Sequence, residues 1–260
     1  MRILLTNDDG LDSFFLHVLA HALREAGHDL SVVAPKTEQS WIGASKSRHR
    51  PVTVAEEERG LKCPTWSVTG TPGDCVNIAL AHILPEYPDA VLSGFNVGCN
   101  ESLGYILASG TIGGAWEGAL HGLPAVALSQ ALTQGAFVRT KEPGVPPLPE
   151  IEETLRHSAA HVARMLPALV RDTPPRGFIV HNLNFPYPCR PESEVRRTVP
   201  ARVLVPAIFG PKAADGTHRF AFTFGKTIDP PGCPLTDRAA IEAGLISHTV
   251  LDYTKIGQPG

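Results

Sequence analysis

The sequence predicts an α/β fold, built on a three-layer, doubly wound and mostly parallel sheet with a smaller strand-rich C-terminal appendage. First, apolar strand segments and amphipathic helical segments alternate through residue 183, which is typical of such sheets. Second, 43% of the 260 residues are apolar, enough to bury a full core. Third, the character of the chain changes after Pro186, where prolines, arginines and short β-like pieces dominate.

The N-terminal part predicts one βαβ unit. Residues 2–6 form a short apolar run that is typical of a buried strand. Apolar residues at helical spacing predict a helix over 14–26, and Gly27 stands where its C-cap belongs. Residues 30–34 give a second strand, which a proline ends. The two strands are expected to be parallel, because a helix connects them.

The later segments continue the alternation and divide the chain. Helices are predicted over 71–84, 111–121, 150–170 and 236–243, and strands over 52–54, 66–68, 90–93, 125–129, 178–180 and 245–251, with further β-like pieces at 202–206 and 219–224. The Gly-rich segment 94–110 is interpreted as a loop, and 134–149, with two glycines and four prolines, as a loop or lid. We expect a core over 1–186, an appendage over 187–251 and a tail over 252–260.

Composition narrows the classes of function. The formal net charge is −3, so no basic surplus indicates a nucleic-acid partner. No apolar run is long enough to span a membrane, and no charged leader precedes the first strand, so we expect a cytoplasmic protein without a membrane partner. The five cysteines form no C-x-x-C pair and are interpreted as free thiols in a reducing compartment.

Two adjacent carboxylates, Asp8 and Asp9, follow the first predicted strand. Like charges that close repel each other, so the pair indicates a bound cation. The carboxyl end of a strand is also where ligands bind in open α/β sheets. A helix-capping role would explain one of the two aspartates but not both. We therefore predict one divalent ion per subunit, Mg²⁺ or Mn²⁺, which take one or two carboxylates from a protein.

Neutral oxygen ligands are expected from two other strand ends. Ser40 follows the second strand, and Asn96 follows the strand at 90–93. In a parallel sheet both loops lie at the same edge as the aspartates. Each residue also has an ordinary interpretation, since serine is common in polar loops and asparagine beside glycine is typical of turns.

The segment Ser109-Gly110-Thr111 precedes a predicted helix. Exposed N–H groups and the helix dipole make such a helix start an anion site. The alternative is an ordinary Ser or Thr N-cap, with glycine for close helix–sheet packing. The segment is neither a P-loop nor a G-x-G-x-x-G motif. A metal site and an anion site on one sheet edge together favour a phosphate ester as the substrate.

The ordered set of these motifs resembles the SurE family, over roughly residues 1–251. The resemblance rests on Thr6-Asn7-Asp8-Asp9-Gly10, Ala34-Pro35 with Gln39-Ser40, Gly70-Thr71-Pro72-Gly73-Asp74-Cys75-Val76, Ser93-Gly94-Phe95-Asn96-Val97-Gly98-Cys99-Asn100, Ser109-Gly110-Thr111 through Glu117-Gly118, Asn182-Leu183-Asn184-Phe185-Pro186, Thr236-Asp237 and Gly244-Leu245-Ile246-Ser247. Each motif alone is weak, and the ordered set is specific.

The resemblance implies a Rossmann-like fold and a metal-dependent 5′-nucleotidase that hydrolyses nucleoside monophosphates, often with broad phosphomonoesterase activity. It further implies a C-terminal segment exchanged between protomers of a homodimer or tetramer. The implied site residues are Asp8, Asp9, Ser40 and Asn96 as metal ligands, with Asp8, Asp9 and Asn96 also catalytic, and Asn7, Gly43, Ser109, Gly110 and Thr111 as the phosphate-binding set. We expect a water molecule activated by the metal to attack phosphorus, with attack by an aspartate carboxylate as the alternative.

The chain departs from the family pattern close to these motifs. Leu11 to Phe15 replace a small Ala-Pro-Gly segment, and the bulky Trp41 follows Ser40. These differences motivate one alternative, a phosphatase specialised for another phosphomonoester such as a biosynthetic intermediate. Core packing is the simpler interpretation of Phe14 and Phe15. A second alternative is a non-catalytic nucleotide or phosphate sensor on the same fold.

Overall fold

A mostly parallel sheet forms the centre of the computed structural model, which describes residues 1–142 and 146–257. Its nine strands, in the described residues, run in the order β3-β4-β2-β1-β5-β6-β7-β11-β8. The strands are β1 (Arg2–Thr6), β2 (Asp29–Pro35), β3 (Val54–Glu56), β4 (Thr65–Val68), β5 (Ala90–Val97), β6 (Ala125–Gln130), β7 (Ile179–Phe185), β8 (Val195–Thr198) and β11 (Ile246–Asp252). In the run β4-β2-β1-β5-β6-β7, all neighbouring strands are parallel, whereas β3 is antiparallel to β4 and β11 is antiparallel to β7. This sheet confirms the predicted fold class.

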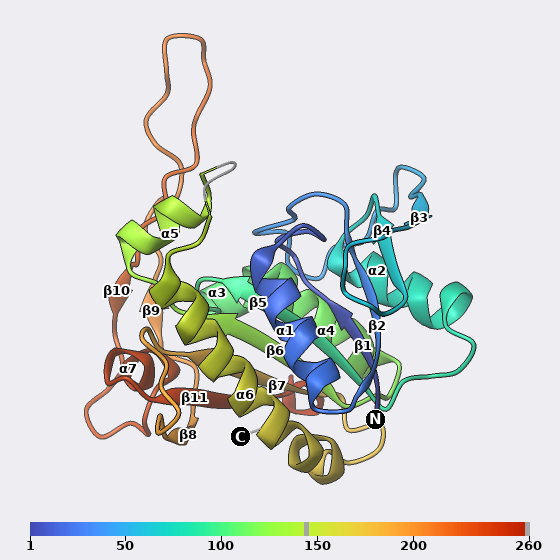
Figure 1. Cartoon of the computed structure of the whole chain (residues 1–260). Helices are drawn as coiled ribbons and strands as arrows, with labels where there is room; N and C mark the ends of the chain where they lie inside the picture. Colours follow the sequence, from blue (N-terminus) through green and yellow to red (C-terminus); the bar gives the residue numbers. More distant parts are fainter. Residues whose placement is uncertain (143–145, 258–260) are drawn as a thin grey trace.

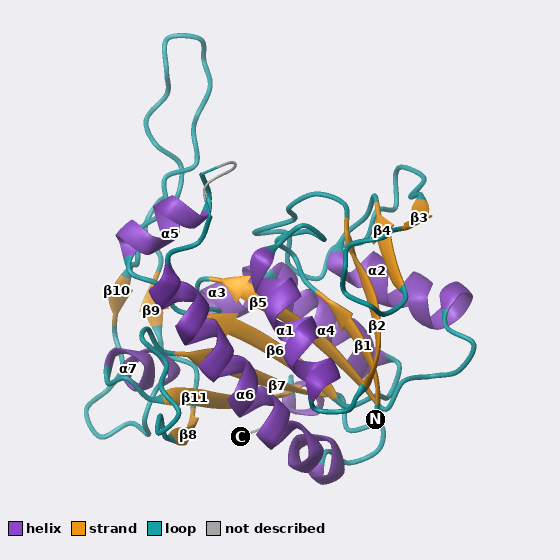
Figure 2. Ribbon diagram, viewed as in Figure 1, coloured by secondary structure: helices purple, strands orange, loops and turns teal. Residues whose placement is uncertain are grey.

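Helices cover both faces of this sheet, and they give the three layers seen in Figures 1 and 2. The helical elements are α1 (Phe14–Glu25), α2 (Pro72–Ile78) continued by the π-helix η1 (Ala79–Ile83), α3 (Ser102–Ala108), α4 (Gly110–Leu120), α5 (Gln134–Thr140), α6 (Pro149–Asp172), α7 (Asp237–Glu242) and the 3₁₀ turn η2 (Tyr253–Lys255). Helices α1 and α6 pack together on one face, and α2 and α4 pack together on the other.

The core lies between the sheet and these helix pairs. Strand β1 buries four successive residues, as expected for a strand covered on both faces. Phe15 of α1 is 2% exposed and lies in the largest apolar cluster, against which Phe14 also packs. The structure therefore supports core packing, the simpler of the two interpretations, for both phenylalanines. In the described part of the chain no helix is long and apolar enough to cross a bilayer.

Two predicted loops contain helices. Strand β5 continues to Val97, and α3 then occupies much of the segment interpreted as a Gly-rich loop. The register between β5 and β6 shifts between Ser93 and Asn96, at the edge of the sheet where Asn96 lies. Helix α5 fills the first half of the predicted loop 134–149, with the Thr133 hydroxyl accepting from the N–H of Ala136. The remainder of this prediction falls partly on residues 143–145, outside the described residues.

The C-terminal segment takes part in the main sheet. Residues 187–251 supply β8 and β11, while β9 (Val203–Leu204) and β10 (Lys226–Thr227) form a separate antiparallel pair. The chain between β9 and β10 projects from the body as a long hairpin (Figure 1). Phe220, in the predicted β-like piece 219–224, makes a single bridge to Phe209. The boundary at residue 186 stays a prediction, and residues 258–260 of the predicted tail lie outside the described residues.

Candidate functional site

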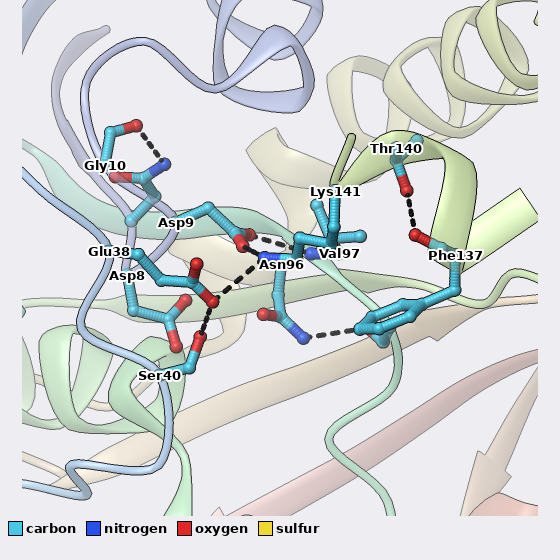
Figure 3. A network of polar contacts seen from close by, with 12 residues as sticks. Asp8, Asp9, Gly10, Glu38, Ser40, Asn96, Val97, Phe137, Thr140 and Lys141 are labelled. Carbon is cyan, nitrogen blue, oxygen red and sulfur yellow. Dashed lines mark hydrogen bonds and ion pairs between the residues drawn. The ribbon is translucent and has the colours of Figure 1, made fainter. Parts of the chain in front are cut away.

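The predicted site residues lie at the carboxyl edge of the parallel strands. Asn7 to Asp9 follow β1, Glu38 to Ser40 follow β2, and Asn96 lies near the end of β5. Figure 3 shows the side chains of Asp8, Asp9, Ser40 and Asn96 gathered at this edge. Strand adjacency explains the gathering, because β1 pairs with both β2 and β5.

Asp8 connects the carboxylate pair to the start of α4. Asp8 is 3% exposed, and its Oδ1 accepts a hydrogen bond from the Thr111 hydroxyl at 2.6 Å. Burial is the main cause that raises the pKa of Asp8 to about 7, the neighbouring Asp9 charge contributes to the rise, and hydrogen bonds from the Thr111 side chain and backbone oppose it. Because Thr111 lies in the first turn of α4, the Asp8 carboxylate lies at the positive end of the α4 dipole.

Asp9 is held by one backbone donor and one cation. Its side chain is 5% exposed, its Oδ2 accepts from the Val97 N–H at 2.8 Å, and its Oδ1 accepts from Lys141 Nζ at 2.9 Å. Burial raises the pKa of Asp9, and the charge and hydrogen bond of Lys141 oppose that rise. Without that cation, the structure would bury two adjacent carboxylates with no charged partner.

Ser40 joins the same network through Glu38. The Ser40 hydroxyl donates to Glu38 Oε1 at 2.7 Å, and Lys141 Nζ donates to the same oxygen at 3.0 Å. Partial burial raises the pKa of Glu38, but the bonds from Ser40 and Lys141 outweigh it and the pKa is lowered. Sequence reasoning missed both Glu38 and Lys141. The available signals were the place of Glu38 two residues before Ser40, and the interpretation of 134–149 as a loop or lid.

Two asparagines present fixed amide groups at this edge. Asn96 Nδ2 donates to the carbonyl of Gly98 at 2.8 Å, and Asn7 Nδ2 donates to the carbonyl of Gly10 at 2.9 Å. Each amide nitrogen thereby uses one of its two N–H donors, which fixes the orientation of the amide and leaves its oxygen available to a ligand. Among the residues that the structure describes, none donates a hydrogen bond to the buried Asn7 Oδ1. An unpartnered buried oxygen is suited to a cation or a donor that binds there.

The predicted anion cradle opens α4. Ser109 is the N-cap, and its hydroxyl accepts from the N–H of Ile112 at 3.1 Å. A Cβ atom at Gly110 would lie 2.9 Å from both Asp8 Oδ2 and the Gln39 carbonyl, so only glycine lets the cradle, the carboxylate and the Ser40 loop meet. The N–H of Gly43 donates to the carbonyl of Ala108 at 2.9 Å, so this N–H is occupied by the chain itself.

Oxygen donors dominate the site. Within the described ranges, no group of three or more His, Cys, Asp or Glu side chains is arranged to hold a metal ion. The predicted set consists instead of two carboxylates, one hydroxyl and one amide oxygen. Hard cations such as Mg²⁺ and Mn²⁺ prefer oxygen donors and accept neutral ones beside one or two carboxylates. Two desolvated carboxylates and the orphaned Asn7 oxygen fit such an ion.

The Trp41 side chain packs into an aromatic cluster. Its φ is +62°, and its ring lies 5.8 Å from that of Tyr105 and 4.9 Å from that of Phe220. Phe220 belongs to the projecting hairpin, so Trp41 links the Ser40 loop to the C-terminal segment. Leu11, another of the unusual residues, is 1% exposed and lies in the core.

Comparisons with known proteins agree on one family. The family model for survival protein SurE matches residues 3–204. A protein of Gloeobacter violaceus named 5′-nucleotidase SurE is 32% identical, with 100% of this chain and 93% of that protein covered. A relative of the same name from Brucella canis is 36% identical, covering 96% of this chain and 92% of its own. For the relative from Synechococcus elongatus, 41% identical, the match spans 62% of this chain and 61% of that protein.

The fold has a solved counterpart as well. The crystal structure of the SurE protein from Aquifex aeolicus superposes with a TM-score of 0.72 at 25% identity, covering 98% of this chain and 97% of the other. The similarity therefore extends beyond the motifs to the whole course of the chain, including the C-terminal strands. With the family model covering most of its length and full-length relatives above 30% identity, the chain belongs to the SurE family.

Proposed function

We propose that this protein is a metal-dependent phosphomonoesterase whose substrates are nucleoside 5′-monophosphates. The relatives named 5′-nucleotidase SurE support this activity, and they do not favour a non-catalytic sensor or a phosphatase specialised for another ester. The observation that carries the proposal is the contact between Asp8 and Thr111, which joins the carboxylate pair to the anion cradle. A phosphoryl group at the cradle would then lie beside the metal ligands.

The proposed ligands of one Mg²⁺ or Mn²⁺ ion are Asp8, Asp9, Ser40 and Asn96. When bound, such an ion supplies Lewis-acid polarisation of a phosphoryl group. The Gly110 N–H and the Ser109 hydroxyl would orient the phosphoryl oxygens and stabilise their negative charge, because the α4 dipole points its positive end there. Thr111, the third member of the cradle, would hold the Asp8 carboxylate beside them. Asn7, through the amide N–H that Gly10 does not accept, completes the proposed phosphate-binding set together with Gly43, which would shape the loop beside the cradle because its own N–H already donates to Ala108.

The test is hydrolysis of nucleoside monophosphates and p-nitrophenyl phosphate with Mn²⁺, with Mg²⁺ and with a chelator. We expect activity with a divalent ion and its loss in chelator.

We expect Asp8→Asn to lower kcat/KM by at least about 100-fold, since mutating even the outer-shell partners of metal ligands lowers metal affinity or activity by about 10–100-fold. Asp12→Asn is the matched control, because Asp12 lies four residues away with a side chain that is 78% exposed. Full activity in chelator, or near-normal turnover by Asp8→Asn, would contradict the proposal.

Assembly into a homodimer or tetramer is also proposed, with residues 187–251 as the contact segment. It is supported by the apolar side chains that the hairpin leaves exposed, among them Phe209 at 58% and Phe224 at 63%. Cytoplasmic location stays a prediction.

A further inference from the structure

The ammonium group of Lys141 stands inside the carboxylate cluster. It is 2.9 Å from Asp9 Oδ1 and 3.0 Å from Glu38 Oε1, and 32% of its side chain is exposed (Figure 3). The geometry therefore places one ammonium group between the proposed metal ligand Asp9 and the neighbouring carboxylate of Glu38.

Helix α5 holds this lysine in place. Lys141 is the C-cap of α5, and its backbone N–H donates to the carbonyl of Val138 at 3.1 Å. Ala136, 5% exposed, anchors the helix in the main core, and the Phe137 ring lies 5.9 Å from the ammonium. The position of the charge is thus fixed by a packed element and by Glu38, independently of Asp9.

The charges of the site explain why a lysine is useful there. Asp8, Asp9 and Glu38 carry three negative charges when all three are ionised, so one bound divalent ion then leaves the cluster with one negative charge. That remainder would repel a phosphomonoester, which carries up to two negative charges near neutral pH. Lys141 brings the cluster with its ion to neutrality.

Two adjacent residues connect this charge to the anion cradle. Asp8 contacts Thr111 of the cradle, and Asp9, the next residue, contacts Lys141. Lys141 has donors to spare, since an ammonium has three N–H bonds and only two protein acceptors are found within hydrogen-bond distance among the described residues. The third donor is free for a phosphoryl oxygen.

We propose that Lys141 binds the phosphate group of the substrate and that Glu38 positions its ammonium for this. The inference rests on the proposed function and deepens it, by adding a cation from α5 to the ligands supplied by the strand ends. Two other roles give different outcomes. A purely structural counter-ion for Asp9 would not affect phosphate binding, and an internal competitor of the metal would weaken metal binding.

The experiment measures direct binding by calorimetry, with inorganic phosphate titrated into the Mn²⁺-saturated protein and Mn²⁺ titrated separately. Lys141→Met keeps most of the side-chain stem and removes the charge. We expect it to weaken phosphate binding about tenfold or more, the value of one charge-assisted hydrogen bond. Lys141→Arg is expected to restore most of the affinity. Arg139→Met is the matched control, because Arg139 is exposed on α5 and loses the same charge away from the carboxylates.

Unchanged phosphate affinity in Lys141→Met would overturn the inference, as would the absence of phosphate binding by the wild-type protein. Tighter Mn²⁺ binding with unchanged phosphate binding would identify a competitor instead. Thermal unfolding checks each variant, and Lys141→Gln replaces the methionine variant if that protein does not fold. Lys141-dependent phosphate binding without hydrolysis of any phosphomonoester would contradict the proposed function alone, whereas hydrolysis with an unaltered KM in Lys141→Met would contradict this inference alone.

Discussion

Gly113 determines how closely the Ser40 loop approaches α4. A Cβ atom at this position would lie 2.3 Å from the carbonyl oxygen of Gly43, a distance that real Cβ atoms do not reach. The loop that carries Ser40 could not keep its position over the cradle with any larger residue there. Helix propensity favours alanine over glycine by about 1 kcal/mol, so at this residue packing and propensity oppose each other.

We expect packing to decide the outcome of Gly113→Ala. Overpacking costs about 1–3 kcal/mol, which exceeds the gain in propensity, so the free energy of unfolding should fall and phosphatase activity should fall with it. Gly135→Ala in α5 is the control, because a Cβ atom there meets nothing within 4 Å and the same change should be neutral or stabilising. Urea unfolding of both variants measures this, and equal stability of Gly113→Ala and wild type would refute it.

Reasoning from strand ends predicted that residues at the carboxyl ends of β1, β2 and β5 lie close together, because parallel strands bring those positions to one edge of the sheet. It could not predict Lys141, which is 132 residues from Asp9 in sequence and reaches it only through the packing of α5. Nor could it predict that the N–H of Gly43 donates to the carbonyl of Ala108, since a backbone bond between a loop and the end of α3 has no side-chain signature. The roles of all these residues in binding stay predictions.

At the scale of elements, the long periodic segments were predictable and the short helices were not. Helix α6 shows a regular apolar stripe over many turns, whereas α3 and α5 have seven residues each. Helix α5 was interpreted as part of a loop because residues 134–149 were counted together, although all four prolines follow residue 142. Helix α3 contains Gly104 and begins at Ser102 with φ +64°, which no local pattern indicates.

The exposed phenylalanines of the projecting hairpin between β9 and β10 predict that the protein forms an oligomer. Phe209, Phe220, Phe222 and Phe224 are all at least 45% exposed, and an apolar surface of this kind marks an interaction site. We expect a dimer or tetramer by light scattering, and at least tenfold weaker association for the double variant Phe209→Ser/Phe224→Ser, because buried aromatic anchors carry most of the binding free energy. Val138→Ser, 55% exposed on α5, is the control. A wild-type monomer at high protein concentration would exclude this role.

At the scale of the whole molecule, two buried histidines tie the C-terminal strand to the core. His181 Nδ1 of β7 lies 2.9 Å from His248 Nε2 of β11, and the Thr173 hydroxyl lies 2.8 Å from His181 Nε2. Burial is the main cause that lowers the pKa of His181 to about 4 and of His248 to about 3, and the charge of Arg197 adds to both. Both imidazoles are therefore neutral in the folded protein at pH 5.

This pair predicts a loss of stability in mild acid. The unfolded imidazoles take up protons near pH 6.5, whereas the folded pair does so only near pH 4 and below, so its contribution is full above pH 6.5 and falls as the pH drops toward 4. His248→Gln should be less stable than wild type at pH 7.5, and the difference should shrink at pH 5. The exposed variant His49→Gln should follow wild type at both pH values. Urea unfolding at the two pH values measures this, and a difference independent of pH would contradict it.

The position of β11 has a consequence for how the protein is made. This strand, at residues 246–252, lies between β7 and β8, so the sheet stays incomplete until residues 246–252 have been synthesised. Until then the nascent polypeptide presents the unpaired edge of β7, an apolar strand with seven residues. Such an edge is a template for pairing between chains. Premature termination before residue 246 should therefore give aggregates during translation rather than a smaller folded enzyme.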